Sequence, residues 1–124
     1  MNVTWSSTPE PKDYPASESY LTLLSDPAEA RRLVAMLAEQ PIVHYKAKDL
    51  LRAAQLPLLP ENDLHVAGDL QKIRSGKELS PVLLVRGTME GVPLLIVDGY
   101  HRVCASYHVS EDVDVSAQLV SRTS

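Results

Sequence analysis

A short run of residues, Asp98-Gly99-Tyr100-His101-Arg102, holds the side chains of this sequence that are best suited to chemistry. An apolar segment typical of a strand precedes the run and a helical pattern follows it, so we expect a strand-to-helix turn. The first turn of a helix has unpaired N–H groups and a partial positive charge, which favour a bound phosphate or carboxylate. Gly99 lets the backbone approach such an anion, and Arg102 can donate two hydrogen bonds to it.

The same turn contains two groups that can exchange protons. His101 can donate or accept a proton, and Asp98 can act as a base, hold a cation or cap the helix. An ordinary capping turn followed by a solvated Arg102 would contain the same residues. The sequence therefore predicts an anion site at this turn and leaves a catalytic role for Asp98 and His101 open.

The remaining patterns predict the elements that position this turn. Residues 1–16 are rich in proline and are expected to form an extended arm, in which Trp5 packs on another surface such as a partner subunit. Periodicity and capping signals predict helices over residues 17–25, 27–40, 49–54, 63–75 and from residue 100, strands over 42–47, 82–86, 93–97 and 113–120, and a hairpin turn over 87–91. The expected fold is one α+β domain over residues 17–124, with a small mixed sheet, flanking helices and an N-terminal helical extension.

Length, composition and charge limit the class of protein. The chain has 124 residues, enough for one domain, and 44% of them are hydrophobic. A net charge of −4 argues against DNA as a partner, because neutralising phosphates requires a surplus of Lys and Arg. The single Cys104 and the spacing of the four histidines predict neither a disulfide nor a metal site. The absence of a long apolar run or a signal-peptide pattern favours a cytoplasmic protein with no membrane segment.

Three segments in this order, LSPVLLVRG, PLLIVDGYHRVCASY and VDVSAQLV, resemble the ParB/sulfiredoxin-like fold over about residues 42–121. Members of that superfamily share a strand, a hairpin partner strand, a Gly-x-[His/Arg]-Arg turn, a helix and a final strand. The turn reads Gly-Cys-His-Arg in sulfiredoxins, Gly-Glu-Arg-Arg in ParB-type partition proteins and Asp-Gly-His-His-Arg in related free serine kinases. The present turn is most similar to the last form, with Tyr100 in place of its first histidine.

The resemblance implies that the turn and its helix bind nucleotide phosphates, with a further contribution from the helix before the hairpin. Placed against sulfiredoxin, that second helix would present His65, Gly68 and Lys72 to the ligand, and their i, i+3, i+7 spacing independently puts them on one face. The implied phosphate- or nucleotide-binding residues are Gly99, Tyr100, His101, Arg102, Lys72, His65 and Gly68. ATP or CTP with Mg²⁺ are the cofactors implied, and the sequence does not choose between them.

Two differences between this sequence and the families argue against the functions of sulfiredoxins and of partition proteins. Tyr100 occupies the place of the nucleophilic cysteine of sulfiredoxins, and a phenol cannot attack as a thiolate does, so sulfiredoxin activity is not expected. The partition proteins have a helix-turn-helix domain that this sequence lacks.

Two functions stay open. The first is a stand-alone module that binds a nucleotide or a phosphorylated small molecule. The alternative is a small phosphotransferase resembling the free serine kinases, with Asp98 or His101 as catalytic base. Binding or processing of nucleic acid is a third, less supported reading. The proline-rich arm and an apolar LPLLP connector at residues 56–60 also suggest a homodimer.

Overall fold

The computed structural model describes residues 1–122, and these form helices on both faces of a four-stranded sheet. The helices are α1 (Asp13–Leu21), α2 (Pro27–Glu39), α3 (Ala47–Ala54), α4 (Leu64–Arg74) and α5 (Tyr100–Val109). The strands are β1 (Val43–Lys46), β2 (Val82–Val85), β3 (Leu95–Asp98) and β4 (Asp114–Val120). The predicted α+β class, a small mixed sheet with flanking helices, is confirmed.

The sheet has the strand order β1-β4-β2-β3. β2 is parallel to β4, whereas β1 and β3 are antiparallel to their neighbours β4 and β2. All four residues of β2 are buried, which explains its continuous apolar sequence, because helices cover both faces of this central strand.

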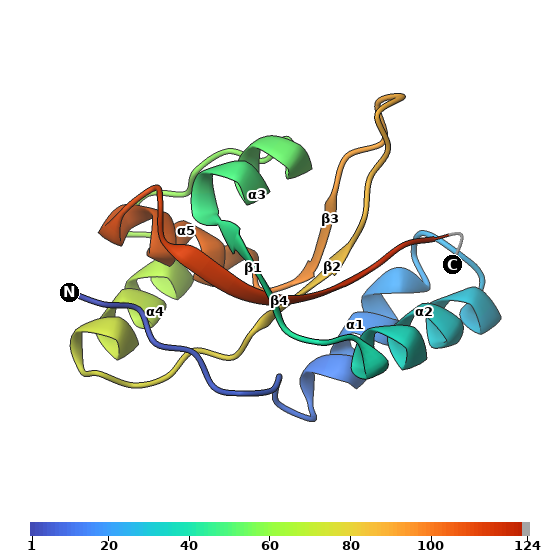
Figure 1. The fold of residues 1–124 in the computed structure, drawn as a ribbon, viewed down its shortest axis with the longest axis horizontal. Helices are drawn as coiled ribbons and strands as arrows, with labels where there is room; N and C mark the ends of the chain where they lie inside the picture. Colours follow the sequence, from blue (N-terminus) through green and yellow to red (C-terminus); the bar gives the residue numbers. More distant parts are fainter. Residues whose placement is uncertain (123–124) are drawn as a thin grey trace.

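Alternation along β2 divides the core into two layers. Leu84 packs with residues of α3, α4 and α5, whereas Leu83 and Val85 pack with residues of α1 and α2. Figure 1 shows α1 and α2 on one side of the sheet and the other three helices on the opposite side. The turn between β3 and α5 therefore follows an edge strand that pairs with the buried β2, and it continues into a helix that packs in the layer with α3 and α4.

The N-terminal segment differs from its prediction as a wholly extended arm. α1 begins at Asp13 rather than at residue 17, so the last part of the predicted arm is helical. Pro15 is compatible with this, because the N–H groups of the first helical turn have no partner within the helix and proline loses nothing there. Trp5 packs against the chain's own core, and the backbone of Leu79 forms hydrogen bonds with Thr4 and Ser6, the residues on either side of Trp5.

The other elements lie close to their predicted positions. Asp26 and Asp63 cap α2 and α4 through hydrogen bonds to backbone N–H groups, and Gly76 has the positive φ of 74° expected after a helix end. Within residues 1–122, none of the helices combines the length and apolar character that crossing a bilayer requires.

Candidate functional site

The predicted strand-to-helix turn is present where β3 ends and α5 begins. Gly99 is the N-cap of α5 and has a φ of 108°, a conformation that other residues rarely adopt. A Cβ atom at Gly99 would lie 2.4 Å from Cγ1 of Val82 and 3.0 Å from Nη2 of Arg102. Glycine is therefore required both by the backbone and by close packing. No side chain caps α5, so its first N–H groups receive no side-chain acceptor from the N-cap residue.

The side chain of Arg102 reaches back past Gly99, the N-cap of α5, and its guanidinium contacts other parts of the chain. Its Nη2 donates to Oδ2 of Asp98 at 2.7 Å, and its Nη1 donates to the carbonyl oxygens of Ser80 and Pro81. Oδ2 of Asp13 lies 4.0 Å from the same Nη1, and the Arg102 side chain is only 14% exposed. The guanidinium that the sequence assigned to a phosphate thus has protein acceptors in the folded chain.

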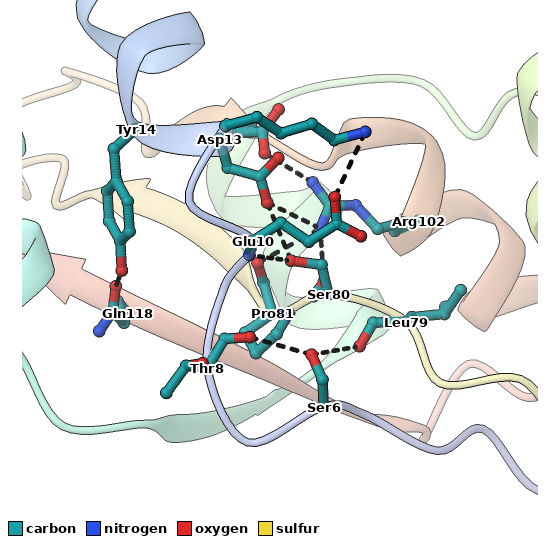
Figure 2. A network of polar contacts seen from close by, with 12 residues as sticks. Ser6, Thr8, Glu10, Asp13, Tyr14, Leu79, Ser80, Pro81, Arg102 and Gln118 are labelled. Carbon is teal, nitrogen blue, oxygen red and sulfur yellow. Dashed lines mark hydrogen bonds and ion pairs between the residues drawn. The ribbon is translucent and has the colours of Figure 1, made fainter.

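Ser80 connects Arg102 to the N-terminal segment. Its hydroxyl donates to Oδ2 of Asp13 at 2.9 Å and accepts from the backbone N–H of Glu10 at 3.1 Å, as Figure 2 shows. We call Asp13, Ser80, Asp98 and Arg102 the Arg102 cluster. It joins the start of α1, the segment before β2, the end of β3 and the first turn of α5.

The surroundings of Asp98 within the Arg102 cluster alter the pKa of its carboxyl. Loss of solvation raises the pKa of this carboxyl above its ordinary value, and the charge of Asp13 acts in the same direction. Arg102 opposes both effects through its charge and its hydrogen bond. Asp98 thus has its acceptor Oδ2 occupied by Arg102, which favours a structural over a catalytic role for it.

A second group of side chains lies where α4 packs on α5. The rings of His65 and His101 are 4.8 Å apart between centroids. His65 of α4 therefore lies beside the turn, as the sequence predicts. Lys72 is 57% exposed, and a Cβ atom added to Gly68 would contact nothing within 4 Å. Among residues 1–122, no protein atom forms a hydrogen bond with the imidazole nitrogens of His65 or His101.

Asp69 belongs to this group and was missed by the sequence analysis. Burial raises the pKa of its carboxyl above the ordinary value, although Lys72, Arg102, His101 and His65 all act on it in the opposite direction. Its side chain is 15% exposed, and its Oδ1 lies 4.0 Å from Nζ of Lys72. Its position one helical turn after His65 could have placed it on the same face of α4.

We call His65, Gly68, Asp69, Lys72 and His101 the histidine surface. Asp63, the N-cap of α4, lies at its border, and hydrogen bonds from the backbone N–H groups of Val66 and His65 lower the pKa of its carboxyl.

The Tyr100 ring lies 5.6 Å from the ring of His101 between centroids, so Tyr100 borders the histidine surface, whereas its hydroxyl reaches the connector before α4. The Tyr100 hydroxyl donates to the carbonyl oxygen of Pro57, and burial raises the pKa of its phenol. Cys104 is fully buried, and burial likewise raises the pKa of its thiol. Neither group is therefore presented as an activated nucleophile.

No group of three or more His, Cys, Asp or Glu side chains within the described residues is arranged to hold a metal ion. Comparison of the chain with models of known protein families, with curated proteins and with solved structures finds no match. The geometry of the chain itself is therefore the main guide to its function.

Proposed function

We propose that this protein binds a phosphate-bearing small molecule, with nucleotides as the leading class, at the histidine surface and the first turn of α5. The observation that carries the proposal is the close pair formed by His65 and His101 beside a helix start that has no side-chain cap. Imidazole N–H groups and helix N–H groups are all donors suited to phosphate oxygens. The family resemblance of the turn supports the same ligand class.

In this proposal the predicted residues have two different roles. His101, His65 and Lys72 would contact the ligand, since they lie on the histidine surface and present donors. Arg102 would act indirectly, because its hydrogen bonds to Asp98 and to the segment before β2 hold the first turn of α5 in place. Asp69 would oppose an anion when it is ionised.

The phosphotransferase alternative is less well supported. A general base must reach the attacking hydroxyl within hydrogen-bond distance. Oδ2 of Asp98 accepts a hydrogen bond from Arg102 at 2.7 Å, so Asp98 would have to leave its partner to serve as that base. His101 has no such restraint and stays the candidate base in this alternative.

The test is calorimetric titration of the parent protein with ATP, CTP and pyrophosphate, each with and without Mg²⁺. We expect saturable binding of at least one of them, weakened about tenfold or more in His65→Ala and in His101→Ala, because each variant removes a charge-assisted donor. His44→Ala is the matched control, since His44 is an exposed histidine on β1 outside this surface. Equal affinity in all three variants, or no binding to the parent, would contradict the proposal.

Thermal unfolding provides the accompanying measurement. A ligand present at about 100 times its dissociation constant stabilises the folded state by about 2.7 kcal/mol. Arg102→Ala is unsuitable as the test variant, because loss of the Arg102 cluster would weaken the fold and the ligand site together.

A further inference from the structure

A cavity of about 520 Å³ lies between α3 and the hairpin formed by β2 and β3, and it contains no residue of the histidine surface. Leu50, Leu84, Leu94 and Leu119 line it with aliphatic carbon. The hairpin extends away from the sheet beside α3 (Figure 1), and the Leu94 N–H donates to the carbonyl oxygen of Ala53 at 3.0 Å, which joins the two walls. The volume is within the range of pockets that hold small organic ligands, roughly 300–1,000 Å³.

Exposed apolar side chains gather around this cavity. Tyr45 is 39% exposed, Val92 is 43% exposed and Met89 is 99% exposed, and all three line it. They come from β1 and from the hairpin, so two separate parts of the chain place apolar surface at one location. Apolar side chains that line a cavity are suited to hold the apolar part of a ligand.

The rim of the cavity is cationic although the whole chain has a net charge of −4. Arg52, Arg86 and Asp49 line it, and two cations with one carboxylate leave a charge of +1. Arg52 pairs with Asp49 at 3.2 Å. Arg86 is exposed, its Nε donates to the hydroxyl of Ser121 at 3.0 Å, and within residues 1–122 no carboxylate lies within 4.0 Å of it.

We propose that this cavity binds a small amphipathic carboxylate, with its apolar chain on the leucine side chains and its head group at Arg86. The aliphatic lining accounts for the apolar part of the ligand, and the unneutralised guanidinium accounts for the anionic part. The site is separate from the proposed phosphate site and does not depend on it.

The experiment is a methyl NMR titration of the whole chain with decanoate and with decanol, both below their micelle-forming concentrations. We expect saturable shifts at the methyl groups of Leu84, Leu94 and Leu119. Arg86→Gln should weaken decanoate binding about fivefold and leave decanol unchanged, because only the carboxylate interacts with the guanidinium. Arg74→Gln, an exposed arginine at the end of α4, is the matched control and should change neither affinity.

A second variant tests the cavity itself, without relying on the interaction between the carboxylate and Arg86. Ala53 is exposed on α3 and lines the cavity, so Ala53→Trp should fill it and abolish the methyl shifts while thermal unfolding reports whether the fold is intact. Absence of saturable shifts in the parent protein would overturn the proposal, whatever the variants do. Equal affinity for decanoate and decanol, unchanged in Arg86→Gln, would overturn the assignment of a carboxylate.

Discussion

The two sides of the first turn of α5 differ in how their charged groups are used. On one side, Arg102 is 14% exposed, donates to Asp98 and to two backbone carbonyls, and lies near Asp13. On the other side, Lys72 is 57% exposed and has one carboxylate at 4.0 Å, and the ring of His101 stands against that of His65. The Arg102 cluster is satisfied within the chain, whereas the histidine surface presents donors to solvent.

A basic residue next to a helix start can thus serve the fold or a ligand, and packing decides between the two. The nearest carboxylate to Arg102 is that of Asp98, four residues before it, and the second comes from a distant part of the chain. Asp13 reaches the cluster because α1 packs beside β3, and Ser80 places a hydroxyl between them. The following changes test this division, from the largest expected effect to the smallest.

Removing the guanidinium should have the largest effect on stability. Arg102→Ala would leave the buried Asp13 carboxyl and the half-buried Asp98 carboxyl without their cation, so we expect the free energy of unfolding to fall by about 3–5 kcal/mol. Urea denaturation measures the change, and Arg31→Ala, an exposed arginine on α2, is the control. A loss no greater than that of the control would show that the Arg102 cluster does not support the fold.

Substitutions of Gly99, in the turn, and of Gly68, in α4 on the histidine surface, should have opposite effects on stability. Gly99→Ala places a Cβ atom 2.4 Å from Val82 at a φ of 108°, and strain with overpacking should cost about 2–4 kcal/mol. Gly68→Ala adds a Cβ atom in open space within α4 and should stabilise the protein by about 0.5–1 kcal/mol. Thermal unfolding of both variants checks the contrast, and a similar response of the two would refute it.

The link to the N-terminal segment should have a smaller effect. Ser80→Ala removes the hydrogen bond to Asp13 and the acceptor for the Glu10 N–H, and we expect a loss of about 1–2 kcal/mol. Limited proteolysis should then cut residues 1–12 faster than in the parent. Ser19→Ala, at an exposed position of α1, provides the comparison, and equal cleavage of both variants would argue that Ser80 does not hold this segment.

The smallest expected effect is the pH dependence due to Asp69. Burial raises its pKa in the folded state, so the folded protein binds the proton more tightly than the unfolded chain does, and stability falls as pH rises through the ordinary carboxyl range. Asp69→Asn removes this penalty. The variant should have the higher midpoint of thermal unfolding at pH 7, with the difference closing as the pH falls below the ordinary pKa of 3.8. A difference that does not depend on pH would contradict this assignment.

Much of the fold follows from local sequence patterns. Alternation and capping residues predict the strands, the hairpin and helices α2, α4 and α5 close to their observed bounds, because periodicity and caps act over a few residues. The main error is the start of α1, because the prolines predict an extended chain although the first turn of a helix accepts proline. The i, i+3, i+7 spacing of His65, Gly68 and Lys72 indicated one face of a helix, and the ring contact between His65 and His101 shows that α4 does reach the turn.

Only part of the Arg102 cluster had a local signal, because Asp98 lies four residues before Arg102 and pairs with it at 2.7 Å. Asp13 and Ser80 lie in segments distant along the chain from Arg102, and only the packing of α1 and the segment before β2 against the turn brings their oxygen atoms to the guanidinium. Asp69 is likewise an ordinary helix residue in the sequence, and its raised pKa comes from the burial that α4 and α5 produce together. Residue types and spacing determine which groups could bind an anion, whereas long-range packing determines which of them the folded chain has already paired.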